Sequence, residues 1–344
     1  MLRLLLAGAL AAMLVSIAAL PGSSAQDTKQ RPKKKERIAV ADPNDAAKDP
    51  DFAIQGEYER TLTVGKEEKV GFHVVAQGEG RFRIKIYRGG LPGAGWNGKD
   101  AAEVATAARV DSKVVIREGN LDIGMIADGI LTVEGKGKST AASAKKVERK
   151  SKTLGEKPPS NAVVLFDREG DEENWDNGKL VPLSDGKFLN VGIKSKAAFG
   201  AFKAHIEFRL PWMPNSTGQG RGNSGVYLQD RYECQILDSF GLSGENNECG
   251  GIYTQHKPKV NMCFPPLAWQ TYDIEFFPAQ FDGKKKIKNA RATIHHNGVL
   301  IHDNVEFPKE CPGGQAETRI PGPFQFQNHG DPVVFRNVWV VAVK

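Results

Sequence analysis

The stretch that decides the fold runs from Arg221 to Gly241 and reads R-G-N-S-G-V-Y-L-Q-D-R-Y-E-C-Q-I-L-D-S-F-G. Apolar and polar side chains alternate on both sides of a short polar turn at Asp230-Arg231, which predicts two strands of a half-buried antiparallel sheet. One face of this pair would enter a core, and the other would line a wet cleft. The wet face carries five polar side chains: Asn223, Tyr227, Gln229, Glu233 and Gln235.

An acidic residue follows the second strand. Asp238 would point away from the wet face in a regular strand, but a single bulged residue would bring it onto the same face as Glu233. Two carboxylates and an amide on one concave sheet can perform acid–base chemistry or hold a metal ion. We therefore take this strand pair as the candidate functional centre.

The first 25 residues predict export. Arg3 gives a positive start, residues 4–20 an apolar core, and Ser23-Ser24-Ala25 a small-residue cleavage site, as in a secretory signal peptide. A membrane anchor is the alternative, and the lack of a charged flank after the apolar run disfavours it. No other stretch is apolar enough to span a bilayer. We expect an exported protein (periplasmic, extracellular or at the cell surface) with no stable membrane span.

The net charge of +6 does not by itself indicate nucleic acid binding. Residues 160–344 carry 20 basic and 21 acidic side chains, so the basic excess lies earlier, largely in residues 29–37 and 136–152. Such Lys-rich segments are typical of solvated tails and linkers. Contact with an acidic surface or polysaccharide is the alternative use. We expect no nucleic acid partner.

Composition divides the 344 residues into five parts. After the signal peptide (1–25), a polar, Lys-rich segment (26–50) is expected to be a disordered linker. Short alternating strands with glycine-bearing turns then predict a small β-sandwich-like domain at 51–135. A Lys-, Ser- and Ala-rich linker occupies 136–159, and residues 160–344 form the large domain.

The large domain is predicted to contain only strands. Short alternating segments recur along it, Asn297-Gly298 is a strong hairpin signal, and no amphipathic helix of useful length occurs. This spacing is typical of an antiparallel sandwich or jelly roll. The fold class is therefore all-β, with a jelly-roll sandwich preceded by the small β domain.

The four cysteines all lie in the large domain, and their even number permits disulfides in an exported protein. Cys249 and Cys263 flank a Pro-rich loop, and we expect them to be bonded to each other. Cys234 with Cys311 would complete the set, but a buried free thiol at Cys234 is the alternative. The spacings do not form a paired C-x-x-C zinc pattern.

A series of motifs in residues 162–343 resembles the 3-keto-disaccharide hydrolase domain family, a concanavalin A-like jelly roll. The motifs follow the expected order: V-L-F-D from Val164, R-G-N-S-G-V-Y-L-Q, Y-E-C-Q-I-L-D-S, C-G-G-I-Y, W-Q-T-Y-D-I, H-N-G-V, G-P-F-Q-F-Q-N-H-G and F-R-N-V-W-V. The resemblance implies the concanavalin A-like lectin/glucanase fold and an enzyme that cleaves 3-keto-glycosides. The small β domain has no equally clear family.

The spacing Glu233-x-Gln235-x-x-Asp238 also matches the bulged acidic motif of laminarinase-like glucanases, which share this fold. Those enzymes have Glu, Asp and Glu at the three positions, whereas here the middle residue is an amide and the last acid is one methylene shorter. A retaining glycosidase needs its two carboxyl groups roughly 5–5.5 Å apart. The changes therefore disfavour direct displacement at C1.

The family name implies a different reaction. A ketone at C3 of a glucoside acidifies the proton on C2, so a base can remove it and the C1–O bond can break by elimination. Water can then add to the resulting glucal, which gives net hydrolysis. Such a site needs a base poised near the working pH and a metal or preorganised donors for the enolate oxygen.

The candidate catalytic residues are Glu233 or Asp238 as the base and His329 as an acid–base partner, with a purely structural hydrogen bond as the alternative for His329. We expect His329 to share one strand face with Gln325 and Gln327. The candidate substrate-binding residues are Arg221, Asn223, Tyr227, Gln235, Tyr253, Gln325 and Gln327. For Arg221 and Asn223, the alternative is that they brace the glycine-rich loop of residues 218–222.

Glu233, Gln235 and His329 are also the candidate ligands of a divalent ion. Their donor set suits Ca²⁺, Mn²⁺ or Mg²⁺ better than Zn²⁺, although Zn²⁺ also accepts His and carboxylate ligands. The chemistry does not demand a metal. The expected partner is a carbohydrate, a 3-keto-glucoside or a related sugar. A non-catalytic, lectin-like sugar-binding module is the alternative function.

Overall fold

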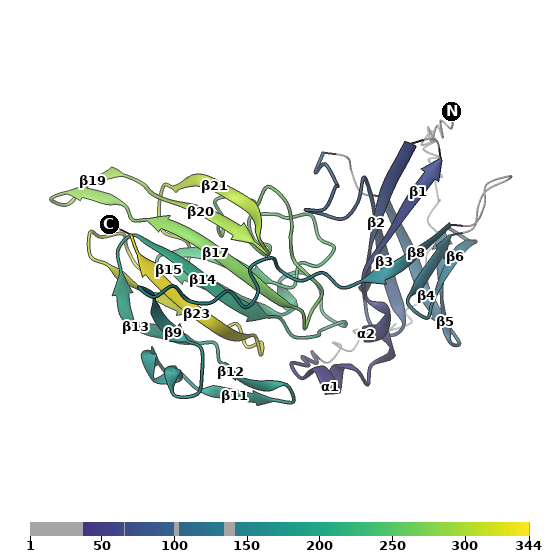
Figure 1. Cartoon of the computed structure of the whole chain (residues 1–344), viewed down its shortest axis with the longest axis horizontal. Coiled ribbons are helices and arrows are strands. Elements are labelled where there is room, and N and C mark those ends of the chain that lie inside the picture. Colours follow the sequence, from purple (N-terminus) through teal and green to yellow (C-terminus); the bar gives the residue numbers. More distant parts are fainter. Residues whose placement is uncertain (1–36, 65, 100–102, 134–141, 344) are drawn as a thin grey trace, which may run out of the picture. The chain divides into compact units, whose positions relative to one another are not determined.

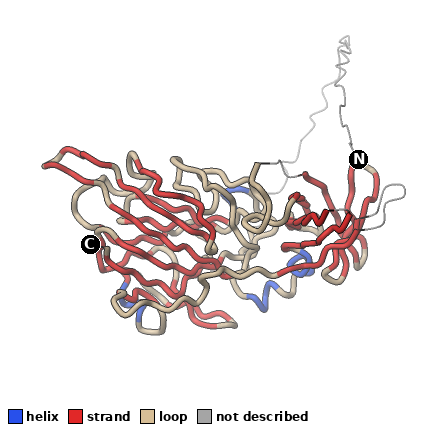
Figure 2. Tube along the Cα trace, turned by 45° about the horizontal axis from the view of Figure 1, so that its top comes forward, coloured by secondary structure: helices blue, strands red, loops and turns tan. Residues whose placement is uncertain are grey.

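The computed structural model describes residues 37–64, 66–99, 103–133 and 142–343, all of which belong to one compact unit. The predicted signal peptide lies outside the described residues. Strands dominate the chain, and helices are few and short (Figure 2). The predicted all-β fold class is confirmed. Among the described residues, no helix has the length and apolarity needed to cross a bilayer.

The first domain is a closed eight-stranded barrel, which replaces the expected small sandwich. Each strand pairs with the next, and the last strand pairs with the first, where Glu57 lies opposite Val147. The strands are β1 (Gly56–Val64), β2 (Lys66–Ala76), β3 (Arg81–Arg88), β4 (Glu103–Val110), β5 (Lys113–Glu118), β6 (Leu121–Ala127), β7 (Ile130–Val133) and β8 (Ala142–Val147). The predicted linker at 136–159 thus supplies the closing strand. In β8, Ala144 is buried in the barrel while Lys145 stays exposed.

The barrel interior is filled by side chains from one face of its strands. They are mainly aromatic and β-branched: Tyr58, Phe72, Val74, Phe82, Ile84, Val114, Ile116, Ile126 and Leu131. Trp212, from the large domain, joins the same cluster, and its indole N–H donates to Asp49 Oδ2 (2.9 Å). The two domains therefore share a core contact.

Residues 37–50 are ordered, so the prediction of disorder at 26–50 was wrong for this part. Val40 forms a β-bridge with Trp212. The short helices α1 (Pro43–Ala46) and α2 (Pro50–Ile54) follow, each with an Asp cap and a proline in its first turn. These local caps and the contact with Trp212 explain why a polar segment is ordered here.

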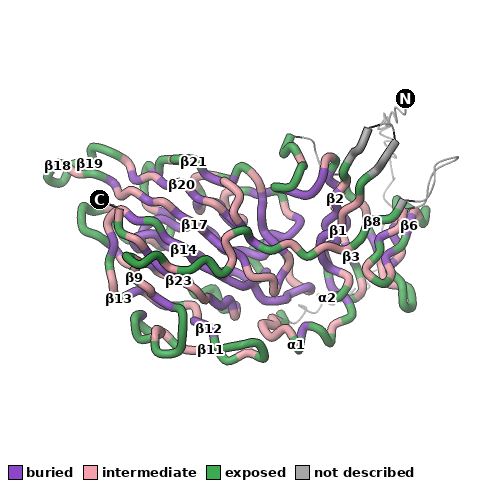
Figure 3. Tube along the Cα trace, viewed as in Figure 1, coloured by how far each residue is buried: buried purple, intermediate pink, exposed green. Residues whose placement is uncertain are grey.

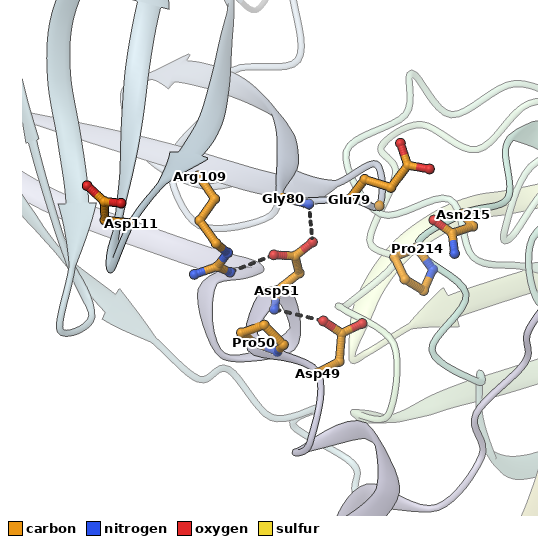
Figure 4. Close-up of a pocket in the computed structure, with 10 residues that line it drawn as sticks. Asp49, Pro50, Asp51, Glu79, Gly80, Arg109, Asp111, Pro214 and Asn215 are labelled. Atoms are coloured by element: carbon orange, nitrogen blue, oxygen red, sulfur yellow. Dashed lines mark hydrogen bonds and ion pairs between the residues drawn. The ribbon is translucent and has the colours of Figure 1, made fainter.

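Figure 4 shows how α2 is fixed to the barrel. The Asp49 carboxylate accepts a hydrogen bond from the Asp51 N–H (2.9 Å). Asp51 in turn accepts from the Gly80 N–H (2.8 Å) and pairs with the Arg109 guanidinium. The carboxylates of Asp49 and Asp51 are therefore committed to structural contacts.

The large domain is a sandwich of two antiparallel sheets, preceded along the chain by the barrel. The first sheet has the order β10 (Trp175–Asp176), β13 (Ile193–Phe199), β22 (Gly322–Phe326), β15 (Asn223–Leu228) and β16 (Tyr232–Leu237). The second has the order β11 (Leu180–Leu183), β12 (Gly186–Leu189), β23 (Val334–Ala342), β14 (Phe202–Arg209), β17 (Trp269–Phe277), β20 (Ala290–His296) and β21 (Val299–Phe307), with β9 (Val163–Phe166) beside β23. Figure 1 shows β14, β17, β20 and β21 side by side.

Smaller elements complete this domain. β18 (Gln280–Asp282) and β19 (Lys285–Lys288) pair with each other, and short 3-10 turns occur at η1 (Asp171–Asn174) and η2 (Gly218–Gly220). The predicted hairpin turn at Asn297-Gly298 joins β20 to β21, with positive φ at both residues.

The core of the sandwich lies between its sheets. Phe326 of the first sheet stacks on Phe335 of the second, with ring centroids 4.0 Å apart, and Phe324 packs on Phe202 at 4.9 Å. β15 and β16 add Val226, Leu228, Cys234 and Ile236 to the same cluster. In Figure 3, β14 and β17 are buried along most of their length.

All four cysteines are buried free thiols, so the predicted Cys249–Cys263 disulfide is not formed. The two residues do come together as the spacing suggested. Each of the two thiols affects the pKa of the other, and the Cys249 thiol is hydrogen-bonded to the Tyr272 hydroxyl, which lies 3.3 Å away.

The barrel holds the loop that follows β16. Arg83 and Lys85 of β3 donate to the carbonyl oxygens of Gly241 (3.0 Å) and Leu242 (3.1 Å). The His73 ring of β2 stacks on Phe240, with centroids 4.4 Å apart. The barrel therefore fixes the end of the strand that carries the candidate functional residues.

Residues 151–156, expected within a linker, are bonded to the outer face of the second sheet. Thr153 Oγ1 donates to Asp273 Oδ2 (2.6 Å), and the Gly155 N–H donates to Glu207 Oε1 (2.6 Å). The carbonyl oxygen of Glu156 accepts from the Trp339 indole (3.3 Å). This segment is a strap across the sheet rather than a free connection.

His205 lies at the centre of this strap region. Its ring is fully buried, between Asp273 (Nδ1–Oδ1, 2.6 Å) and Glu207 (Nε2–Oε1, 3.4 Å). Burial alone would lower the pKa of His205, but the hydrogen bonds and charges of the two carboxylates outweigh burial and raise the pKa to about 9. His205 is therefore an imidazolium at neutral pH.

We expect this charge to make stability fall in alkaline solution. Because the folded pKa of His205 lies above its unfolded value of about 6.5, the stabilisation is complete below about pH 6.5 and is lost as pH rises through about 9. The loss corresponds to about 3 kcal/mol of unfolding free energy. Urea unfolding at about pH 6 and about pH 9.5 measures it.

His205→Gln should be less stable than the wild type at the lower pH and should lose most of this pH dependence. His295→Gln is the matched control, because His295 lies half-buried on β20 of the same sheet, separated from β14 by β17. An equally steep alkaline loss in His205→Gln and the wild type would contradict the assignment.

Candidate active site

The candidate site lies on the face of β15 and β16 that points away from the sandwich core. The two strands pair in register, with Tyr227 opposite Glu233 and Gly225 opposite Gln235. Since side chains alternate along a strand, these four residues share one face, whereas Val226 and Cys234 lie on the opposite face, in the core. β22 places Gln325 opposite Tyr227. The predicted polar face is therefore present for Asn223, Tyr227, Glu233 and Gln235. Gln229 does not belong to it: β15 ends at Leu228, and Gln229 lies in the turn that follows, where its amide donates to the Phe199 carbonyl oxygen (2.7 Å).

Glu233 is the buried carboxyl of this face, with only 2% of its surface exposed. It lies against Gly225, where an alanine would place its methyl carbon 2.3 Å from Glu233 Oε1, so the close approach requires glycine. Burial raises the pKa of Glu233 to about 7. A carboxyl with this pKa can both accept and donate a proton near neutral pH.

The hydrogen bonds around Tyr227 indicate which form of Glu233 the site favours. The Tyr227 hydroxyl lies 2.9 Å from Glu233 Oε2, 2.7 Å from the Pro312 carbonyl oxygen and 3.4 Å from Gln327 Nε2. A hydroxyl has one proton to donate and two lone pairs to accept with. Pro312 can only accept, and it makes the shortest contact, so the hydroxyl proton goes to Pro312.

Glu233 completes this network when it is protonated. Its own O–H then donates to the Tyr227 oxygen, whose other lone pair accepts from Gln327. If Glu233 were ionised, Tyr227 could satisfy only one of two acceptors. The hydrogen-bond arrangement therefore favours the protonated form of Glu233. Burial raises its pKa to about 7, so that both the acid and the carboxylate are present near neutral pH.

Asp238 and Arg221 do not join this face: the bulge that would bring Asp238 onto it is absent, and Arg221 takes the alternative, bracing role. No bulge interrupts β16, and Asp238 continues the core-facing alternation. Its carboxylate is fully buried and forms an ion pair with the Arg221 guanidinium (3.0 Å). The two charges neutralise each other out of reach of solvent. Asp238 therefore does not supply the second carboxyl group of the face, and Arg221 braces the strand end.

His329 also departs from its predicted position. β22 ends at Phe326, so His329 lies on the exposed segment that follows and does not continue the strand face of Gln325 and Gln327, both of which are half-buried. Tyr253 lies in a turn beside the site, where its N–H donates to the Glu233 carbonyl oxygen (3.0 Å). Its side chain is half-buried.

One further site residue, Gln219, was not predicted. It extends from the turn η2 over Asn223 and Gln235, both of them buried. The only sequence signal is a polar side chain between glycines in G-Q-G-R-G, directly before the strand that carries the site.

The proposed ligand set of Glu233, Gln235 and His329 does not fit a divalent ion. Glu233 Oε2 is engaged by Tyr227, and Gln235 Oε1 accepts from the Ile236 N–H (3.0 Å). His329 is exposed beyond the end of β22. Elsewhere in the described residues, Glu156, His205 and Asp273 lie close enough to share an ion, but His205 is positively charged there.

Replacement of Tyr227 by Phe should lower the pKa of Glu233 by about one unit. The substitution removes the acceptor of the protonated carboxyl, which is worth about 1.4 kcal/mol. ¹³C NMR titration of glutamate carboxyl carbons measures the pKa, with Glu233→Gln to assign the resonance. Tyr253→Phe, which alters a neighbouring hydroxyl, should leave the titration in place. A rise in the pKa of Glu233 in Tyr227→Phe would mean that Tyr227 donates to an ionised carboxylate.

The geometry can be compared with known proteins. Two solved structures of candidate glycosyl hydrolases from Parabacteroides distasonis are similar to the chain. The one at 2.13 Å is 31% identical with a TM-score of 0.48, over 54% of this chain and 85% of that one. The one at 1.70 Å is 16% identical with a TM-score of 0.32, over 44% and 74%.

No curated protein matches the sequence. Residues 161–341, more than half of the chain, match the family described as the 3-keto-alpha-glucoside-1,2-lyase-like domain. This match covers both sheets of the sandwich, including every strand of the polar face. The chain belongs to the 3-keto-alpha-glucoside-1,2-lyase-like domain family.

Proposed function

We propose that this protein is an exported enzyme that cleaves 3-keto-glycosides by removing the C2 proton and eliminating the C1 oxygen. The observation that carries the proposal is Glu233, a buried carboxyl whose pKa of about 7 suits a proton carrier. Membership of a family of carbohydrate-active domains supports the substrate class. Export rests on the signal peptide predicted from residues 1–25.

The reaction begins with ionised Glu233. Its carboxylate takes the proton from C2, and the electron pair of the C–H bond forms an enolate with the C3 ketone. When the enolate collapses, the C3 carbonyl forms again, a C1–C2 double bond appears and the C1–O bond breaks. The leaving oxygen takes a proton, which neutral Glu233 can return. Water then adds across C1–C2 to give the free 3-keto sugar.

The structure argues against displacement at C1 by a pair of carboxylates. Glu233 is the acid that the polar face of β15 and β16 presents, whereas Asp238 is buried in its ion pair with Arg221. A retaining glycosidase needs a second carboxyl group roughly 5–5.5 Å from the first. Elimination needs a single proton carrier, and amide side chains such as Gln235 can stabilise the developing charge.

Glu233→Gln should reduce cleavage of a 3-keto-glucoside by about 10²–10⁴-fold, because the amide cannot carry the C2 proton. Release of p-nitrophenol from the two anomers of p-nitrophenyl 3-keto-glucoside measures the rate. The parent p-nitrophenyl glucosides, which lack the ketone, should not be cleaved by elimination.

Glu275→Gln is the matched control, since Glu275 lies on the outer face of the second sheet, next to Lys203. It should cleave at the wild-type rate. If wild type and Glu233→Gln released sugar equally slowly while both bound it, the protein would be a lectin-like module and not an enzyme.

The pH dependence should follow the ionisation of the base. The value of kcat/KM is expected to rise with pH and to level off above about 7, because only the carboxylate form of Glu233 can remove the C2 proton. Substrate deuterated at C2 should react more slowly, since the C2–H bond breaks. A profile that falls through neutral pH, with no isotope effect, would point to direct hydrolysis by an acid.

A further inference from the structure

Two buried side-chain amides at the site donate towards a single oxygen. Asn223 Nδ2 lies 3.3 Å and Gln235 Nε2 lies 3.4 Å from Gln219 Oε1. These contacts are long for N–H···O hydrogen bonds, which have a mode near 2.9–3.0 Å. The Gln219 oxygen therefore occupies the position between the two donors without binding them tightly.

The orientations of all three amides follow from their backbone partners. Asn223 Nδ2 also donates to the Gln219 carbonyl oxygen (3.2 Å), and Gln235 Oε1 accepts from the Ile236 N–H (3.0 Å). Gln219 Nε2 donates to the Asn247 carbonyl oxygen (2.6 Å). Because a backbone group cannot exchange its donor or acceptor role, each amide has one consistent orientation. The N–H groups of Asn223 and Gln235 thus both face the Gln219 oxygen.

The donors and the acceptor differ in how firmly they are held. Asn223 and Gln235 are 0% and 2% exposed and belong to paired strands. Gln219 is exposed, on the short turn η2, and at the two flanking glycines a Cβ would meet no atom within 4 Å. The bond of Gln219 Nε2 to the Asn247 carbonyl oxygen is the remaining anchor of this side chain, so its oxygen can leave the two donors when that bond turns or breaks, while the donors stay in place.

We propose that the Asn223 and Gln235 amides form the pocket for the C3 ketone oxygen of the substrate, and that the Gln219 oxygen fills this pocket until the substrate displaces it. The inference rests on the proposed function, of which it specifies one contact. Two fixed N–H donors are the kind of group that stabilises an enolate oxygen. Gln235 and Glu233 are two residues apart on one face of β16, about 6.7 Å along the strand. Base and oxygen pocket thus lie on one face of the same strand, two positions apart.

A second observation points to a ligand at the same place. Asn223 Oδ1 is buried and has no hydrogen-bond partner. A buried acceptor without a partner is unfavourable, and a hydroxyl next to the ketone could donate to it. The pocket then selects a ketone flanked by a hydroxyl, which is the pattern of a 3-keto sugar.

The test measures binding without turnover, in the full-length Glu233→Gln background. The probes are methyl 3-keto-glucoside and methyl glucoside, with affinity measured by calorimetry. Adding Gln219→Ala should tighten binding of the keto probe by about tenfold, because two competing hydrogen bonds are removed. Gln219→Asn should also tighten binding of the keto probe, since its side chain is one methylene shorter and its oxygen lies farther from the two donors.

Isosteric changes to the donors should have the opposite effect. Asn223→Asp and Gln235→Glu replace N–H groups by oxygens, and each should weaken binding of the keto probe by about tenfold or more. Neither variant should weaken the binding of methyl glucoside as much, so the ratio of the two affinities, which measures the preference for the ketone, should fall. Gln280→Glu on the exposed strand β18 is the matched control and should leave both affinities unchanged.

The inference is overturned if Gln219→Ala and Gln219→Asn leave the affinity for the keto probe unchanged or weaken it. It is also overturned if the donor variants keep the preference for the ketone while the wild type cleaves 3-keto-glucosides, and the proposed function then stands. If the affinities shift as expected but the wild type releases no p-nitrophenol, the pocket stands and the proposed function fails.

Discussion

The polar face of the site depends on the unbroken register between β15 and β16. Because the side-chain period of a strand is two, this register places Tyr227 beside Glu233 and sends Val226 and Cys234 into the core. A shift of one residue would exchange the two sets, burying the carboxyl among aromatic rings. The same pairing that closes the sandwich core therefore also assembles the site. The barrel contributes by holding the loop after β16, through Arg83 and Lys85.

Two buried titratable groups in this chain show how partners decide charge. His205 lies between two carboxylates, and their combined effect outweighs burial, so the ring is charged at neutral pH. Glu233 has one near partner, a hydroxyl whose proton already goes to Pro312, so burial prevails and raises the pKa of the carboxyl to about 7. Burial is similar in the two places, and the hydrogen-bond inventory makes the difference. The two carboxylates that flank the charged His205 ring bind the strap of residues 151–156 to the second sheet, whereas Glu233 can gain or lose a proton near neutral pH.

The sequence was most informative where structure is local. Alternation predicted the β15–β16 pair and its polar face, and Asn297-Gly298 predicted its hairpin. Alternation could not predict the course of the chain beyond Leu237, because the ion pair of Asp238 with Arg221 depends on tertiary packing. Barrel closure was missed for the same reason: β8 has a Lys-rich sequence and is a strand because β1 and β7 lie beside it. The role of Gln219 becomes visible only from the positions of the two amides beneath it.

Trp212 makes the sandwich domain depend on the barrel that precedes it. This residue lies inside the segment that matches the family, yet its indole is packed with Phe52 in the core of the barrel and bonded to Asp49. Cutting the chain before residue 161 would leave a large aromatic side chain facing water and an unpaired indole N–H. The sandwich domain therefore cannot be separated from the barrel, or joined to a different domain, without exposing this side chain. A sandwich that was combined with another partner domain during evolution would first need a smaller or more polar residue at position 212.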